Sequence, residues 1–322
     1  MKKIIFTSLF FLASTAVVAV ENNLSEEVEA YFKQGFEFIA AKNPDAAIPL
    51  LDKAVELDPE NANAYLNRAG AYYGKGNLAG IRGQPYHKIF DAAIRDCDKA
   101  IELDPKHADA YNTRGMAHLG KGDVLAALRD YDTAIELDPT LARAYVNRGH
   151  WYADRKFTHM AMKDYNAAIE LDPNKAAIYN NRGMLHDQME NAVAAKKDYD
   201  KAIELDPTFA MAYNNRGIAH DMGGDLHAAI NDYNKAIELN PEYADAHYNR
   251  GRTHFDNNDM EASLRDLDKA VELNPGIARH YFYRGKTHLK MGGTDAAQQD
   301  FDKAVELDSK FFPRVRQLQD SK

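Results

Sequence analysis

Proline recurs at a fixed interval along most of this 322-residue chain. From Pro105 to Pro275 the prolines of this series are 34 residues apart, and each ends a phrase similar to DKAIELDP. An earlier member, Pro59, precedes Pro105 by 46 residues, which is one period plus an insertion of 12 residues. Self-similarity at a fixed period of about 20–50 residues indicates a repeat architecture, in which each repeat packs on its neighbours.

Each repeat is predicted to contain two helices. In the repeat at 210–243, the first helix is expected over 210–222 and ends at a glycine pair. The second is expected over 225–239, where apolar residues recur at intervals of three and four, so that one face is apolar. Pro241 lacks an amide hydrogen and keeps this helix from continuing. Such a hairpin cannot cover its own apolar face and must stack on the next hairpin.

The 34-residue unit resembles the tetratricopeptide repeat (TPR). That family has characteristic residues at repeat positions 4, 8, 11, 20, 24, 27 and 32, which in the repeat at 210 are Tyr213, Gly217, His220, Ala229, Tyr233, Ala236 and Pro241. The resemblance implies an all-α fold: an α-solenoid of eight helix-turn-helix TPR units forming a right-handed superhelix.

Eight repeats fit the sequence. Their predicted ranges are 28–61, 62–107, 108–141, 142–175, 176–209, 210–243, 244–277 and 278–311, followed by a C-terminal capping segment at 312–322. The insertion falls near 78–90, between the helices of the second repeat. We expect a loop there, either passive or carrying contacts through Arg82, Tyr86, His87 and Lys88.

The N-terminus has the features of a bacterial signal peptide. Lys2 and Lys3 precede a largely apolar stretch at 4–18, and Ala19 is a small residue suited to a cleavage site. The alternative is an uncleaved membrane anchor, but the stretch is shorter than the roughly 20 residues that span a bilayer. We therefore expect a signal peptide at 1–19 and a periplasmic or secreted protein.

Composition and motifs argue against several classes of function. The formal net charge is −9, which disfavours nucleic acid as the main partner. The single cysteine, Cys97, excludes an internal disulfide and is expected to be an inert buried thiol. The sequence has no HExxH, CxxC or GxSxG motif, so we predict no enzyme activity, no catalytic residues, no metal, no cofactor and no small-molecule substrate.

Arginine and aspartate recur together. Every repeat except the first has arginine at position 7 and aspartate at position 23, whereas the first has Gln34 and Leu50. Because one partner of a partly buried ion pair is costly to lose alone, both should be present or both absent. We predict an ion pair between the two helices of each repeat, for example Arg216 with Asp232.

Histidine recurs at position 11. A metal ladder is one interpretation, but neighbouring helices lie about 8–10 Å apart, whereas each zinc ligand must lie about 2 Å from the ion. Packing in place of the family's aromatic residue is therefore favoured. The histidines are His118, His186, His220, His254 and His288.

Asparagines at positions 5 and 6 are the main candidates for ligand binding. In the family the first helix of each repeat lines a concave groove, and these positions face it. An amide side chain carries both a donor and an acceptor and can pair with a peptide group. A strand rises about 3.3 Å per residue, so helices about 10 Å apart would meet every third residue of an extended peptide. The alternative is that asparagine is only a tolerated surface residue. The candidate peptide-binding residues are Asn67, Asn112, Asn147, Asn180, Asn181, Asn214, Asn215, Asn249, Asp187, Asp221, Met184 and Ile218.

These observations favour a non-enzymatic protein–protein interaction scaffold or adaptor of the bacterial cell envelope. It would bind an extended peptide segment of a protein partner in its groove. The alternatives are an accessory subunit of a secretion or envelope-biogenesis complex, or a self-assembling structural solenoid. In the last case exposed Phe311 and Phe312 would mediate self-association through the solenoid ends.

Overall fold

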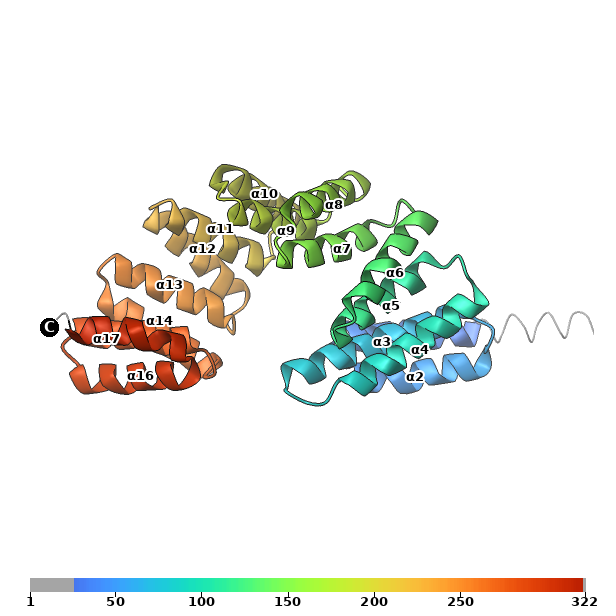
Figure 1. The fold of residues 1–322 in the computed structure, drawn as a ribbon, viewed down its shortest axis with the longest axis horizontal. Helices are drawn as coiled ribbons and strands as arrows, with labels where there is room; N and C mark the ends of the chain where they lie inside the picture. Colours follow the sequence, from blue (N-terminus) through green and yellow to red (C-terminus); the bar gives the residue numbers. More distant parts are fainter. Residues whose placement is uncertain (1–25, 321–322) are drawn as a thin grey trace, which may run out of the picture. The chain divides into compact units, whose positions relative to one another are not determined.

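The computed structural model describes the backbone of residues 26–320, in which all regular secondary structure is helical (Figure 1). The expected all-α helical-repeat fold is confirmed, while the predicted signal peptide lies outside the described residues. The chain divides into two compact parts, one ending at Trp151 and the other beginning at Tyr152. Within residues 26–320 there is no helix of the length and apolarity that a membrane span requires.

The N-terminal part consists of successive helical hairpins. Its helices are one over 26–40, α2 (Pro44–Leu57), α3 (Ala62–Ile81), α4 (His87–Leu103), α5 (Ala108–Lys121) and α6 (Val124–Leu137). The next helix, α7 (Ala142–Asp154), contains the division between the two parts.

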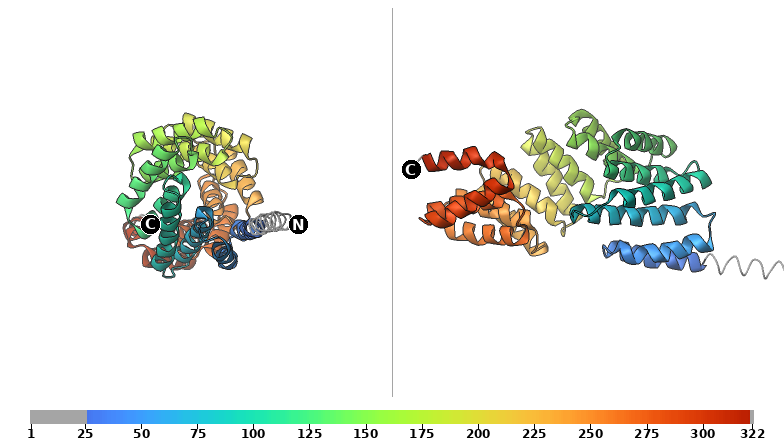
Figure 2. Two further views of the ribbon diagram at one scale, coloured as in Figure 1. Left: turned by 90° about the vertical axis from the view of Figure 1, so that its right-hand side faces the viewer. Right: turned by 60° about the horizontal axis from the view of Figure 1, so that its bottom comes forward.

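The C-terminal part continues the same alternation of first and second helices (Figure 2). Its helices are α8 (Thr158–Leu171), α9 (Ala176–Gln188), α10 (Ala192–Leu205), α11 (Ala210–Met222), α12 (Leu226–Leu239), α13 (Ala244–Asp256), α14 (Met260–Leu273), α15 (Ala278–Lys290), α16 (Thr294–Leu307), the short 3-10 helix η1 (Ser309–Phe311) and α17 (Phe312–Asp320).

Local sequence explains where the second helices begin and end. Five of them begin after an asparagine or aspartate whose side chain accepts a hydrogen bond from the backbone N–H three residues later, as Asp225 does from Ala228. Such a cap satisfies a donor that the helix leaves unpaired. Seven second helices end at a leucine that directly precedes an Asp-Pro or Asn-Pro pair, because proline disfavours the helical conformation of the residue before it. They are α2, α4, α6, α8, α10, α12 and α14.

A close approach between position 8 and position 24 holds six of the hairpins together. In the third repeat, a Cβ at Gly115 would lie 2.8 Å from the ring of Tyr131, and in the sixth a Cβ at Gly217 would lie 2.7 Å from the ring of Tyr233. The second repeat has Ala69 in place of this glycine. The second repeat accommodates the methyl group of Ala69 because position 24 is Cys97, which is fully buried and smaller than the tyrosine of the other two repeats.

The prediction of a loop at 78–90 is only partly confirmed, because residues 82–86 connect the two helices while the rest of the range lies within α3 and α4. Most of the 12 inserted residues lengthen the two helices of the second repeat, so that α3 has 20 residues and α4 has 17. The reason is Phe90, which is buried against α3 and α5: a Cβ at Gly76 or Gly120 would lie 2.6 Å or 2.5 Å from its ring. Burying this ring stabilises the extended hairpin.

Of the four residues expected to be exposed in that insertion, three are exposed, namely Arg82, His87 and Lys88. Tyr86 is partly buried, with its ring centroid 5.8 Å from that of Phe90.

At the C-terminus, α17 covers the apolar side of the last hairpin. Val315 is buried in a cluster with Phe282 and Phe301. The ring of Phe311 packs on Phe282, with centroids 5.0 Å apart, whereas Phe312 is 55% exposed. Of the two phenylalanines considered for end-to-end association, only Phe312 is therefore largely exposed to solvent.

Candidate functional site

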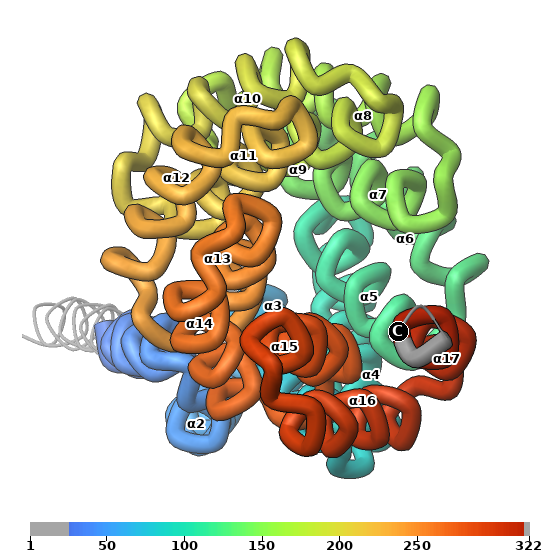
Figure 3. The backbone as a smooth tube through the Cα atoms, turned by 90° about the vertical axis from the view of Figure 1, so that its left-hand side faces the viewer, coloured from blue at the N-terminus to red at the C-terminus, as the bar shows by residue number. Residues whose placement is uncertain are grey.

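The first helices of neighbouring repeats lie against one another. Contacts join α3 with α5, α9 with α11, α11 with α13, and α13 with α15, whereas the second helices α10, α12, α14 and α16 make no comparable contacts with each other (Figure 3). Because the first helices are the closer set, they line the inner side of each part. We call this surface the first-helix face; it carries the predicted binding residues.

Most of the predicted asparagines pair with one another. The position-6 amide of one repeat donates a hydrogen bond to the position-5 carbonyl of the repeat before it. The three such bonds are Asn147 to Asn112 at 2.9 Å, Asn215 to Asn180 at 3.0 Å, and Asn249 to Asn214 at 2.9 Å. The position-5 partners are between 1% and 3% exposed, so the pairs join neighbouring repeats.

These pairs narrow the set of amides that a ligand can reach. Asn249 is also buried, whereas Asn147 and Asn215 remain partly exposed. Asn67 and Asn181 are partly exposed and make no side-chain hydrogen bond to another described residue. The repeat before each of them has an apolar residue at position 5, Phe32 or Val146. The pairing could have been predicted, because asparagine at position 5 is always followed one repeat later by asparagine at position 6.

The two predicted aspartates are also engaged by the protein. Asp187 accepts a hydrogen bond of 2.6 Å from the hydroxyl of Tyr199, and Asp221 accepts from Arg252 and Thr253. Burial raises the pKa of Asp187, although the bond from Tyr199 opposes this. The predicted apolar residues remain more accessible, because Met184 is 41% exposed and Ile218 is partly exposed.

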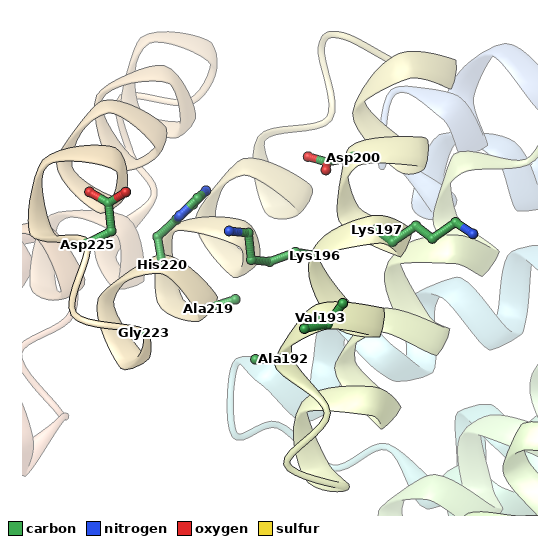
Figure 4. A pocket seen from close by; sticks show the side chains of 9 residues that line it. All are labelled: Ala192, Val193, Lys196, Lys197, Asp200, Ala219, His220, Gly223 and Asp225. Atoms are coloured by element: carbon green, nitrogen blue, oxygen red, sulfur yellow. The ribbon is translucent and has the colours of Figure 1, made fainter.

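A hollow of about 490 Å³ lies between α10 and α11, away from the predicted residues (Figure 4). Lys196 extends into it toward His220, while Lys197 points the other way. Its carboxylates are engaged elsewhere, since Asp200 pairs with Arg216 and Asp225 caps α12. Six other repeats have isoleucine, leucine or methionine where the fifth has Lys196, which explains the gap: the ammonium group does not fill the space of an apolar side chain.

A second hollow, of about 510 Å³, opens on the first-helix face of the N-terminal part. Phe36, Leu66 and Met116 supply apolar walls, and Phe36 is 49% exposed. Asn67 and Asn112 of the predicted set lie on its lining.

Two polar pairs also line this hollow. His107 Nε2 lies 3.0 Å from Asn63 Oδ1, and Arg143 makes a two-point ion pair with Asp109, with a shortest distance of 2.7 Å. These four groups satisfy one another and leave the apolar walls as the open surface.

An adjoining hollow of about 180 Å³ shares Ile39 and Gly70 with the first. A Cβ at Gly70 or Gly74 would meet no atom within 4 Å, so these glycines leave space along α3. Phe36, Gly70 and Met116 are not among the predicted binding residues. All three occupy position 9, as do the predicted Met184 and Ile218, so the same reasoning extended to every repeat would have found them.

The predicted Arg–Asp pairs are confirmed in six repeats, the second, the third and the fifth to eighth, where the arginines also connect neighbouring repeats. Arg216 donates to both carboxylate oxygens of Asp232 at 2.9 Å and 2.7 Å. Its remaining terminal nitrogen donates at 2.7 Å to Asp200 of the preceding repeat. The hydrogen bonds to these carboxylates raise the pKa of Arg216, which therefore stays charged. The same arrangement recurs around Arg68, Arg114, Arg182, Arg250 and Arg284.

The position-11 histidines lie beside these pairs. In each case Nε2 is between 3.8 Å and 4.0 Å from the aspartate that the arginine binds. Residues 26–320 contain no cluster of three side chains arranged to hold a metal ion. Burial raises the pKa of the Cys97 thiol, so this group is protonated at neutral pH.

Comparison with known proteins identifies the repeat. Family models described as tetratricopeptide repeat match residues 38–80, 108–141, 142–175, 176–209, 198–231, 244–277 and 278–311, and one described as TPR repeat matches 222–258. A comparison with curated proteins finds no match.

Among solved structures, the chain is similar to the APC/C hetero-tetramer Cut9–Hcn1, with 18% identity and a TM-score of 0.67 over 83% of this chain and 50% of that one. Yeast Tom70 is 18% identical, with a TM-score of 0.62 over 92% of this chain and 65% of that one. The type IV pilus biogenesis factor PilW is 20% identical, with a TM-score of 0.58 over 63% of this chain and 94% of that one.

At these identities the likeness establishes the fold alone, and the chain spans half the length of the Cut9–Hcn1 chain that it matches. Stacked repeats of this kind present extended surfaces that serve as interaction scaffolds and typically lack catalytic activity. The matched repeats, the 34-residue period and the recurring Gly–Tyr and Arg–Asp contacts agree, and the chain belongs to the tetratricopeptide repeat family.

Proposed function

We propose that this protein is an adaptor that binds an extended segment of a partner protein on the first-helix face of its N-terminal part. The observation that carries the proposal is the hollow of about 510 Å³ between the first helices of the first three repeats. Small-molecule and side-chain sites commonly have volumes of about 300–1,000 Å³ and mostly apolar walls with a few polar groups.

The chemistry of the hollow suits a peptide with a large apolar residue. Phe36 and Met116 offer exposed or partly exposed apolar surface, and methionine adapts its shape to different partners. Gly70 leaves room for an incoming side chain. Asn67 retains both its amide donor and its acceptor and can pair with a peptide group of the bound segment.

Filling the hollow tests the proposal. Peptides selected from a random library for binding to the protein would be titrated against Gly70→Leu and Asn67→Ala. We expect Gly70→Leu to weaken binding at least about ten-fold, because leucine occupies the space of the bound side chain. Glycine is unfavourable inside a helix, so this substitution should not unfold α3.

The matched control is Ala192→Leu, which adds the same side chain at an exposed position on α10. It should leave affinity unchanged. Equal affinity of the parent protein and Gly70→Leu for every selected peptide would refute the proposed site.

We also propose that the protein acts in the bacterial envelope after removal of residues 1–19, on the basis of its charged and apolar N-terminal sequence. Fractionation of the producing cells followed by mass spectrometry of the intact protein should find a chain beginning at Val20 outside the cytoplasm. A full-length chain in the cytoplasmic fraction would contradict this location.

A further inference from the structure

Charged side chains on the first-helix face of the C-terminal part mostly have partners within the protein. Asp221 binds Arg252 and Thr253, Asp187 binds Tyr199, and Arg279 pairs with Asp245. Lys286 and Lys290 of α15 differ, since no carboxylate of the described residues lies within 4.0 Å of either ammonium group.

Comparison of two neighbouring repeats explains this difference. Arg252 occupies position 9 of the seventh repeat and binds Asp221, at position 12 of the sixth. Lys286 occupies position 9 of the eighth repeat, but position 12 of the seventh is Phe255. An aromatic ring therefore stands where the preceding repeat supplies the counter-ion.

Two aromatic rings hold Lys286 in place, and a third packs against one of them. Its ammonium nitrogen lies 4.4 Å from the ring centroid of Phe255 and 4.7 Å from that of Tyr283. Tyr283 packs edge-on against both Phe255 and Tyr248, with centroid separations of 6.4 Å and 5.7 Å. Attraction between a cation and an aromatic face fixes the position of the ammonium group but does not neutralise it.

Lys290 brings a second positive charge to the same ring. Its ammonium nitrogen lies 5.9 Å from the centroid of Phe255. Burial lowers the pKa of Lys286, Asp256 opposes that shift, and the charge of Lys290 adds to it. Both ammonium groups therefore lie at the same aromatic ring, and a carboxylate bound there would be attracted by both.

We propose that Lys286 and Lys290, with Phe255 and Tyr283, bind an acidic segment of a partner protein through its side-chain carboxylates. The inference rests on the proposed adaptor function, because it assigns a chemistry to a second stretch of the first-helix face. Each lysine donates to a carboxylate of the segment, and an apolar side chain between the acidic residues packs on the exposed part of the two rings. In a chain with net charge −9 this local positive site selects acidic segments over basic ones.

The test uses a fluorescein-labelled peptide of alternating glutamate and leucine, with blocked ends so that only side-chain carboxylates are present. The same peptide with glutamine in place of glutamate is the matched ligand. We expect the glutamate peptide to bind the full chain at least about ten-fold more tightly than the glutamine peptide. Equal affinities would overturn the proposal.

The protein variant is Lys286→Met with Lys290→Met, which keeps the apolar stems against Phe255 and removes both charges. The control is Lys235→Met with Lys269→Met, which makes the same charge change at two lysines that pair with Glu238 and Glu272 on second helices. We expect about ten-fold weaker binding of the glutamate peptide to the first variant and unchanged binding to the control. Circular dichroism establishes that both remain helical.

Other outcomes distinguish the possible failures. Equal binding of the glutamate peptide to parent and Lys286→Met/Lys290→Met refutes this site and leaves the N-terminal site untouched. A phosphoserine peptide that binds about ten-fold more tightly than the glutamate peptide would overturn the assignment to carboxylates. Gly70→Leu closes the N-terminal hollow. If this variant still binds the glutamate peptide, the protein has two separate sites. If it no longer binds the peptide, Lys286 and Lys290 are not the binding groups.

Discussion

The first-helix face of the first three repeats and that of the last two have the same backbone but opposite chemistry. At position 9 the first three repeats have Phe36, Gly70 and Met116, which leave an apolar hollow, whereas the last two have Arg252 and Lys286, which bring positive charge. The packing residues at positions 8, 20 and 27 change little between these regions. The repeat therefore separates the residues that build the scaffold from those that define what each segment can bind.

The largest expected effect comes from breaking the scaffold that both regions share. Arg216→Ala removes the partner of Asp232, whose side chain is only 9% exposed, and leaves a buried charge. We expect the free energy of unfolding to fall by about 3–5 kcal/mol, measured by urea denaturation. The control is Arg216→Gln with Asp232→Leu, which copies the first repeat; a double variant as unstable as Arg216→Ala would contradict the buried-charge explanation.

Two glycine substitutions sharpen the contrast between packed and open positions. Gly115→Ala places a Cβ 2.8 Å from Tyr131 and should destabilise the protein by about 1–3 kcal/mol. Gly70→Ala places a Cβ in open space and should stabilise it by about 0.5–1 kcal/mol, because alanine is favoured in helices. Thermal unfolding of the two variants checks the opposite signs, and a shift in the same direction would show that the hollow at Gly70 closes in solution.

Salt should separate the two proposed binding regions. Raising NaCl from about 50 mM to about 500 mM should weaken binding of the glutamate peptide at Lys286 and Lys290 about ten-fold, because salt screens exposed charges. Binding of an apolar peptide at the N-terminal hollow should change little over this range. Fluorescence anisotropy at each salt concentration makes the comparison, and equal salt dependence would mean that both peptides use the same site.

The smallest effect expected is a pH dependence of stability in the C-terminal part. His280 is fully buried beside Tyr248, and burial and the nearby Arg279 lower its pKa, while Asp245 acts in the opposite direction. Because the histidine binds protons more readily when unfolded, its contribution to stability is present above about pH 6.5 and is lost as the pH falls. His280→Phe should reduce the slope of the unfolding free energy against pH between about pH 7 and pH 5. If the plots of unfolding free energy against pH are parallel for parent and variant, His280 is not the cause of the pH dependence.

Regular spacing made most of the scaffold predictable. The 34-residue period identifies the hairpins, and the joint replacement of arginine and aspartate in the first repeat identifies Arg216 and Asp232 as partners. The link from Arg216 to Asp200 was missed although position 25 is aspartate or asparagine in every repeat from the first to the eighth. It joins different repeats, and the pattern within one repeat does not reveal it.

The binding surface was less predictable because accessibility depends on neighbours in space. Asn214 and Asn215 are adjacent in sequence, yet Asn214 is buried and bonded to Asn249 while Asn215 remains partly exposed. Likewise, the insertion at 78–90 has loop-like glycines, but burial of Phe90 between α3 and α5 stabilises the helical conformation. In the first case a contact with the following repeat determines which asparagine is buried, and in the second it determines that the inserted residues are mostly helical.

The amino-acid sequence alone predicts stacked helical hairpins, the bounds of the two helices in the repeat at 210–243, and the pairing of arginine with aspartate within a repeat. Those features depend on local periodicity, capping and fixed spacing, all of which are visible along the chain. The packing of the repeats is needed to learn which asparagines are buried between repeats, where the hollow beside Phe36 and Gly70 opens, and that no carboxylate of the described residues lies within 4.0 Å of the Lys286 ammonium group. Free volume and the distances between charged groups depend on how side chains from adjacent repeats meet, and the sequence of one repeat does not contain that information.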